Sequence, residues 1–352
     1  MNTSQILLAW YDKNKRDLPW RKTANPYFIW LSEVILQQTR VEQGTSYYLK
    51  FIGKYPTVAK LAAANESEIL KLWQGLGYYS RARNLHAAAK EIVLNHKGTF
   101  PASYADIRAL KGIGDYTAAA ISSFAFRQKH AVVDGNVFRF LSRYFGISTP
   151  INSTQAKKEF HDVAYELLAD NAPNQFNQAI MEFGALQCKP SPDCSSCPLN
   201  SSCLAFENNS VRNFSVKIKK QKSRNRYFYY LVLRKNNAIY LNQRTGKDIW
   251  QNLYEFPLIE TKKRIKNSDI SNEPEWRRLF NSDEVIIGQI SKERKHILSH
   301  QILHAKFVEI NIKEKNFSVP SHWEKVSQSK ISKYAVPRLI DKYLQEQESF
   351  YI

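Results

Sequence analysis

The chain has 352 residues, of which 43% are apolar and 13% aromatic, and its formal net charge is +19. This composition excludes a disordered chain, and no apolar run reaches membrane-spanning length. The length favours two domains over one, and the charge favours a polyanionic partner, although a basic surface also aids solubility. The first ten residues lack the features of a signal peptide, so we expect a cytosolic protein.

The N-terminal residues predict an amphipathic helix over residues 4–12, followed by Arg16-Asp17-Leu18-Pro19-Trp20-Arg21. Arg21 then belongs either to a loop that contacts phosphate or to a surface loop with a tryptophan anchor. The next helix places Glu33 among Trp30, Leu31, Val34 and Ile35. Burial there would raise the pKa of Glu33, as a general acid requires, but alone a helix-surface or capping carboxylate is the simpler interpretation.

Residues 57–97 predict two helices, with a capping box at Asn65 and Glu68. Between the helices, residues 75–83 combine glycines, arginines and tyrosines, including Tyr78. Aromatic side chains stack on bases or wedge between them, and arginines contact phosphates. The alternative is a glycine helix cap with packing tyrosines.

Gly112-Ile113-Gly114 predicts a tight turn between two helices. We expect Ser103 to cap the helix before the turn and Asp115 to cap the helix that begins near Tyr116. Bare N–H groups at a helix N-terminus suit a phosphate, so this unit predicts a helix–hairpin–helix that holds a nucleic-acid backbone without reading its sequence. An ordinary helix–helix turn is the alternative.

Asp134, Gly135 and Asn136 follow about twenty residues later, just before another helix. A carboxylate there would face whatever the hairpin holds. Further on, a helix carries Gln178, whose acceptor and donor match an adenine edge, although an ordinary helix glutamine explains it too.

All four cysteines lie between residues 188 and 203, which excludes a secreted disulfide framework. They are Cys188, Cys194, Cys197 and Cys203. Four thiolates in one short loop can enclose a metal centre. Zinc is one candidate, but structural zinc usually has two separated Cys-x-x-Cys pairs, whereas this loop has one close pair and two outlying cysteines.

Residues 217–226 contain six basic residues and no acidic one, which predicts a basic linker over residues 210–226 that contacts DNA. The pattern then becomes strand-like. It predicts strands at 227–234, 238–241, 285–290 and 307–312, a turn at Asn236-Asn237, and a final helix after Pro337.

Several of these motifs resemble those of the MutY family of adenine DNA glycosylases, in the helix–hairpin–helix superfamily. Residues 31–41 are similar to the family's catalytic-glutamate helix, residues 75–81 to its DNA-wedging loop, and residues 133–137 to the segment with its aspartate. The cysteine loop is similar to that of the family and of endonuclease III, although its first gap is five residues instead of the usual six. Residues 250–257 resemble the entry to a Nudix-like fold.

The acidic, magnesium-binding helix of Nudix hydrolases is missing from the sequence after Pro257, which indicates a binding module. His296-Ile297-Leu298-Ser299-His300 resembles the segment with which the family recognises 8-oxoguanine. Leu298 replaces a phenylalanine there, while Ser299 and His300 remain as hydrogen-bonding groups; without the resemblance, these two would be the polar face of a strand.

The resemblance implies a mostly α helix–hairpin–helix domain over residues 1–209, including the cluster loop 188–203. The basic linker and an α+β Nudix-like lesion-recognition domain over residues 227–352 follow. It implies a 4Fe–4S cluster and a monomer that acts on double-stranded DNA with an adenine mispair. The protein would have no membrane association and would be a bacterial-type cytoplasmic protein on the nucleoid.

The implied reaction is the removal of adenine opposite 8-oxoguanine or guanine, at the start of base-excision repair. Protonated Glu33 would donate toward adenine N7, and Asp134, kept ionised by helix dipoles, would stabilise the sugar cation. Tyr116 and Asn136 would position Asp134 and the intermediate. The remaining contacts would be Gln178 to adenine, the lesion-probing residues Leu36, Gln38 and Tyr78, and the phosphate-binding residues Lys111, Gly112 and Gly114.

Tyr116 occupies the position of the lysine nucleophile in glycosylase/lyases, which implies a monofunctional glycosylase. The alternatives are a glycosylase/lyase for oxidised pyrimidines, a silent lesion-binding protein and a redox protein. The retained Glu33 and Asp134 speak against a silent protein, and the hairpin and basic charge against a purely redox one.

Overall fold

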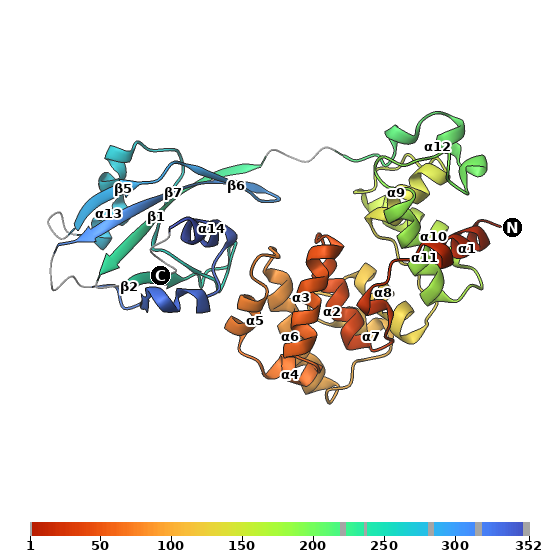
Figure 1. The fold of residues 1–352 in the computed structure, drawn as a ribbon, viewed down its shortest axis with the longest axis horizontal. Coiled ribbons are helices and arrows are strands. Elements are labelled where there is room, and N and C mark those ends of the chain that lie inside the picture. The colour runs from red at the N-terminus through yellow and green to blue at the C-terminus, as the bar shows by residue number, and fades with distance from the viewer. Residues whose placement is uncertain (1, 219–222, 236–237, 281–284, 314–318, 348–352) are drawn as a thin grey trace. The chain divides into compact units, whose positions relative to one another are not determined.

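The structure is a computed structural model that describes residues 2–218, 223–235, 238–280, 285–313 and 319–347 (Figure 1). The chain divides into two compact units: Met1–Ala63 with Asn84–Lys220, and Ala64–Arg83 with Gln221–Ile352. Residues 219–222 of the predicted linker and the predicted turn at 236–237 lie outside the described residues. Across the described ranges, no helix combines the length and the apolar character needed to cross a bilayer.

The first unit is helical. In chain order it contains α1 (Thr3–Asn14), η1 (Pro19–Arg21), α2 (Pro26–Leu36), α3 (Val41–Lys54), α4 (Val58–Ala63), most of α6 (Ser80–Asn95), α7 (Tyr104–Ala109), α8 (Asp115–Phe126), α9 (Gly135–Tyr144), α10 (Thr154–Leu168), α11 (Pro173–Leu186), η2 (Asn200–Ser202), α12 (Leu204–Glu207) and η3 (Val211–Asn213). The predicted opening helix is confirmed.

The prediction of two helices over residues 57–97 is wrong, because α5 (Glu66–Leu72) separates α4 from α6. Asn65 takes an extended conformation (φ −72°, ψ 137°) between α4 and α5, and this ends the helical path. Asn65 is the N-cap residue of α5, as expected, but its side chain makes no capping hydrogen bond.

The helices of the first unit form two lobes (Figure 1). In one lobe α1 returns to pack against α9, α10 and α11, so that Leu7 shares an apolar core with Phe140, Phe160 and Phe183. In the other lobe α2 packs against α3 and α8. The N-terminal helix therefore helps to build the lobe that otherwise comes from residues 131–207.

The second unit has one mixed sheet, formed by eight strands among the described residues. Its central strand β1 (Arg224–Lys235) pairs in parallel with β7 (Gln301–Ile312) and antiparallel with β2 (Ala238–Gln243) and β4 (Leu258–Thr261). The other strands are β3 (Tyr254–Glu255), β5 (Val285–Ile290), β6 (Arg294–Ile297) and β8 (Trp323–Ser327). All four predicted strands are present, although β7 begins six residues before the predicted position.

The two faces of this sheet carry different cores, because successive residues of a strand point to opposite sides. Residues 228, 230 and 232 of β1 pack with α14 (Arg338–Glu346), where the ring of Tyr343 stacks on Phe307 with centroids 3.8 Å apart. Residues 229, 231 and 233 pack with η4 (Asn267–Asn272) and α13 (Pro274–Leu279). The predicted α+β class of this domain is confirmed.

Candidate active site

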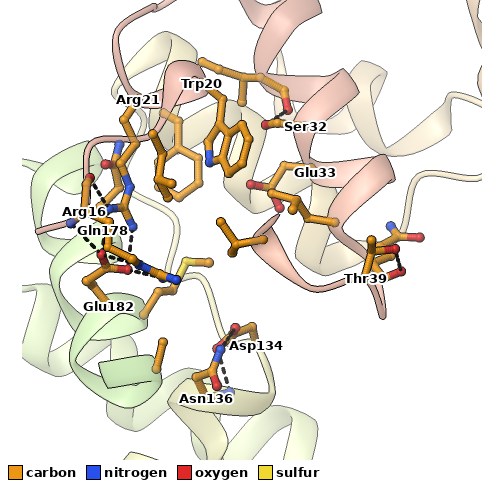
Figure 2. A pocket seen from close by; sticks show the side chains of 18 of the residues that line it. Arg16, Trp20, Arg21, Ser32, Glu33, Thr39, Asp134, Asn136, Gln178 and Glu182 are labelled. Atoms are coloured by element: carbon orange, nitrogen blue, oxygen red, sulfur yellow. Dashed lines mark hydrogen bonds and ion pairs between the residues drawn. The ribbon is translucent and has the colours of Figure 1, made fainter. Parts of the chain in front are cut away.

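A pocket of about 540 Å³ lies in the first unit, with walls from both helical lobes (Figure 2). A volume of this order suits a small ligand or a single base. Its lining combines apolar side chains with a few charged ones. The predicted site residues among them are Arg21, Glu33, Leu36, Gln38, Tyr116, Asp134, Asn136 and Gln178.

Glu33 lies on α2 and is only 8% exposed. The hydroxyl of Tyr116, on α8, donates to Glu33 Oε2 at 2.8 Å. Burial raises the pKa of Glu33 to about 7, although the hydrogen bond from Tyr116 lowers it; the charge of Asp134 adds to the rise. A carboxyl group with this pKa is partly protonated near neutral pH, which is the state that a general acid needs.

Asp134 is the N-cap residue of α9. Its Oδ1 accepts the backbone N–H groups of Asn136 and Val137 at 2.9 and 2.8 Å, and its Oδ2 accepts Asn136 Nδ2 at 2.7 Å. Burial raises the pKa of Asp134, and these hydrogen bonds and Arg139 oppose the rise. The helix start supplies the expected donors, but burial outweighs their effect on the pKa. Asn136 holds Asp134 as predicted, whereas Tyr116 bonds to Glu33.

Glu182, on α11, is a functional candidate that the sequence reasoning missed. Its carboxylate is 1% exposed and accepts both guanidiniums, with Nη2–Oε2 distances of 2.6 Å to Arg16 and 2.8 Å to Arg21. Burial alone would raise the pKa of Glu182, but the hydrogen bonds from Arg16 and Arg21 lower it to about 2. The arginines predicted to contact phosphate are therefore held at the pocket wall (Figure 2). Glu182 lies four residues after Gln178, so both side chains lie on the same face of α11. This spacing was the feature of the sequence that could have indicated Glu182.

Replacing Glu182 by alanine is expected to lower the free energy of unfolding by about 3 kcal/mol, because two partly buried guanidiniums lose their carboxylate. Urea unfolding at pH 7 measures the change. The contribution of Glu182 is present above its unfolded pKa near 4.5 and is lost as pH falls toward 2. An equal deficit at pH 7 and pH 2.5 would contradict this assignment.

The other pocket residues lie as follows. Gln178 Oε1 accepts the hydroxyl of Tyr11 at 2.8 Å, and the amide nitrogen of Gln178 is the group left to face a ligand. Leu36 is the last residue of α2, and Gln38 follows it in a left-handed conformation (φ +57°). This turn ends the helix at the pocket rim, where the predicted lesion-probing residues would lie.

The predicted helix–hairpin–helix consists of α7, a turn and α8. Ser103 accepts the N–H of Asp106 at 3.1 Å, so the predicted cap of α7 is confirmed. The prediction that Asp115 caps α8 is wrong. Gly114 is the N-cap residue, and Arg108 binds the carboxylate of Asp115 with an Nε–Oδ1 distance of 2.6 Å. Lys111, Gly112 and Gly114 are exposed around the buried Ile113, which leaves this backbone open to a ligand.

Changing Gly112 to alanine is expected to weaken binding to undamaged duplex DNA about tenfold, because the hairpin must shift. Gly112 has φ +79°, and an added Cβ would lie 2.5 Å from Cβ of Asn84. Left-handed backbone and this clash both disfavour a side chain. Gly53→Ala, on α3, is the control, since its added Cβ would meet no neighbouring side chain or backbone segment within 4 Å. Equal affinities for the two variants in fluorescence anisotropy would contradict the prediction.

The four cysteines line one hollow beside α9. The buried Arg143 donates to Sγ of Cys188 at 3.5 Å and to the carbonyl oxygens of Lys189 and Pro190 at 2.8 and 3.0 Å. Within the described residues, no set of three or more candidate ligands is arranged to hold one metal ion. Four thiols around a common hollow do fit a cluster, whose several iron atoms each take one ligand.

The remaining predicted residues lie in the second unit. Ser299 and His300 are exposed at the turn of the β6–β7 hairpin, while Leu298 packs against the core beneath α14. The exposed ring of Tyr78 follows α5, and its hydroxyl lies 3.0 Å from Oγ of Ser299. The predicted wedge and one predicted lesion-recognising residue are therefore in direct contact.

The fold and the pocket define a helix–hairpin–helix DNA glycosylase with a Nudix-like domain. Residues 31–164 match the HhH-GPD superfamily of base excision DNA repair proteins, and residues 228–346 match the NUDIX domain. A solved structure of a thermostable thymine-DNA glycosylase, 32% identical, has a TM-score of 0.55 over 58% of this chain and 95% of that chain.

Similarity to named proteins shows to which family of DNA glycosylases this chain belongs. The adenine DNA glycosylase of Buchnera aphidicola subsp. Baizongia pistaciae is 38% identical over 305 residues, which are 85% of this chain and 83% of the relative. The adenine DNA glycosylase of Homo sapiens is 44% identical over 209 residues, 56% of this chain and 38% of that protein. The chain belongs to the adenine DNA glycosylase family. It is a monofunctional DNA glycosylase, a hydrolase.

Proposed function

We propose that this enzyme removes adenine that is mispaired with 8-oxoguanine, or with guanine, in duplex DNA. The observation that carries the proposal is the buried Glu33, with a pKa near 7, in a base-sized pocket that also holds Asp134. The shared family name and the net charge of +19 support the substrate class.

In the proposed reaction the adenosine leaves the base stack and enters the pocket. Glu33 transfers its proton to adenine N7 while the bond from N9 to the sugar breaks, and the bonding electrons leave with the base. The sugar becomes an oxocarbenium ion, which the negative charge of Asp134 stabilises. Water adds to the sugar and gives up its proton to Glu33, which restores the acid. Tyr116 orients Glu33, Asn136 orients Asp134, and Gln178 contacts the adenine edge.

The proposed DNA contacts come from three elements. Lys111, Gly112 and Gly114 bind phosphate, since hairpin N–H groups favour anions. Leu36, Gln38 and Tyr78 fill or probe the gap that the extruded base leaves. Ser299 and His300 contact the 8-oxoguanine. Their exposed position at the turn of the β6–β7 hairpin leaves both side chains accessible to a base.

We further propose that Cys188, Cys194, Cys197 and Cys203 hold a 4Fe–4S cluster. Each of the four thiolates would hold one iron atom, and a bound cluster would cross-link the cysteine loop. Purified enzyme is expected to contain about four iron atoms per chain and little zinc. Metal analysis with acid-labile sulfide determination measures this. One zinc per chain without sulfide would instead indicate a structural zinc site.

The test of the proposed function is adenine release under single-turnover conditions from duplexes with adenine opposite 8-oxoguanine, guanine or thymine. Each product is analysed with and without alkali. Rapid release opposite 8-oxoguanine, with strand breakage only after alkali, is expected. No release opposite any partner despite tight binding would favour a silent lesion-binding protein, and breakage without alkali would favour a lyase.

A further inference from the structure

The loop that carries Tyr78 is held in one conformation by its own side chains. Tyr78 itself has a left-handed backbone (φ +44°), which is unusual for a residue other than glycine. The guanidinium of Arg81 lies over the rings of Trp73 and Tyr78, 5.0 and 5.7 Å from their centroids. Trp73 Nε1 donates to the carbonyl of Gly77 at 3.0 Å. The exposed ring therefore projects from an ordered loop.

Gln74 ties the start of this loop to the C-terminal part of the same unit. Its Nε2 donates to Oδ1 of Asp341, on α14, at 2.9 Å. Its Oε1 accepts Nζ of Lys71 at 2.9 Å and the N–H of Val336 at 3.3 Å. Lys71 also donates to the carbonyl of Tyr334 at 3.0 Å. One amide side chain thus joins α5 to the segment that leads into α14.

The end of the loop has a second attachment to the same part of the chain. The hydroxyl of Tyr79 donates to the carbonyl of Val336 at 3.4 Å. The hydroxyls of Tyr78 and Ser299 lie 3.0 Å apart. Residues 74–79 are therefore attached to residues 336 and 341 of the same unit, next to the contact between Tyr78 and Ser299.

We propose that Gln74 is a positioning residue, paired with Asp341, that sets the preference for 8-oxoguanine over guanine opposite adenine. The inference rests on the proposed function. Its physical basis is that Ser299 and Tyr78 must reach the lesion together. 8-Oxoguanine has an N–H donor at position 7, whereas guanine has an acceptor there. A serine hydroxyl can accept from the first or donate to the second, but when Ser299 donates its proton to the Tyr78 hydroxyl only its acceptor lone pairs remain, which favours 8-oxoguanine. Loss of alignment should therefore slow the reaction of the 8-oxoguanine duplex selectively.

The first test replaces Gln74 by alanine and compares single-turnover adenine release opposite 8-oxoguanine and opposite guanine. The ratio of the 8-oxoguanine rate to the guanine rate is expected to fall about tenfold, because only the 8-oxoguanine duplex should react more slowly. A change of about tenfold corresponds to the loss of about one well-made hydrogen bond that aligns the loop. The control is Gln345→Ala, which removes a 3.1 Å hydrogen bond to the other oxygen of Asp341 without touching α5. Its ratio should match that of the wild type.

A rescue experiment separates positioning from general damage. Gln74→Glu places a second carboxylate against Asp341 and should lower the ratio. Adding Asp341→Asn restores a pair of one amide donor and one carboxylate, because the new amide at position 341 can donate to the new carboxylate at position 74. The ratio should then return to within about threefold of the wild type.

An unchanged ratio in Gln74→Ala, an equal slowing of both duplexes, or no rescue in the double variant would each overturn the inference. If the wild type releases no adenine opposite either partner, the proposed function fails and the inference falls with it, whereas equal wild-type rates opposite the two partners overturn the inference alone. A preference that persists in Gln74→Ala overturns only the role of Gln74.

Discussion

Replacing Glu33 by glutamine is expected to slow adenine release by about a hundredfold or more, because the proposed proton donor is lost while the shape of the side chain is kept. The buried carboxyl and its hydrogen bond from Tyr116 are the basis of this expectation. Single-turnover release from the 8-oxoguanine duplex measures the rate. A rate within about twofold of the wild type would show that Glu33 is not the acid.

The pH dependence tests the same assignment independently. Since the raised pKa of Glu33 is about 7, the protonated fraction and the rate should fall as pH rises through 7. The residual rate of Glu33→Gln should lack this decline. The free energy of unfolding should change with pH in the same direction as the rate. Protonated Glu33 favours the folded state, and this contribution to stability is lost as pH rises from about 4.5 to about 7. At pH 8 the glutamine variant should therefore be no less stable than the wild type.

Replacing Asp134 by asparagine is expected to slow adenine release by about a hundredfold to a thousandfold. The asparagine oxygen can still accept the N–H groups of Asn136 and Val137 and cap α9, so the fold is retained. What is lost is the negative charge that would face the sugar cation, together with the 2.7 Å hydrogen bond that Oδ2 accepts from Asn136 Nδ2. The measurement is again single-turnover release, with affinity for a duplex that contains an uncleavable adenosine analogue as the control.

Three results are informative for Asp134→Asn. Slow release with unchanged affinity would indicate that the charge acts in the transition state. Release at the rate of the wild type would exclude electrostatic stabilisation by Asp134. A joint loss of affinity and thermal stability would indicate that the cap of α9, instead of the charge, had been disturbed.

The sequence predicted those pocket residues that belong to short motifs. The lining of the pocket by Glu33 and Asp134 and the cap at Ser103 followed from local patterns. The spacing of Glu182 from Gln178 places it on the same helix face but does not reveal its partners, because Arg16 and Arg21 lie 166 and 161 residues earlier and meet it only in the folded chain. The misplaced cap at Asp115 has a similar cause: Arg108, in the preceding helix, competes for its carboxylate.

The second unit shows the same limit. The longer strands were evident from their β-branched and aromatic residues, but the short strands β3, β4, β6 and β8 form because β1, β2 and β7 offer them edges. Likewise, no local pattern around residues 64–83 shows that this segment associates with residues 221–352. Such groupings depend on tertiary contacts that periodicity does not encode.

The two carboxyl groups of the pocket come from different lobes, Glu33 from α2 and Asp134 from the start of α9. Burial is the main cause of the raised pKa of Glu33 and the charge of Asp134 adds to it, so the proton affinity of Glu33 also depends on its distance from Asp134. If capture of an extruded base brought the two groups closer together, base binding near neutral pH would be accompanied by proton uptake from solvent.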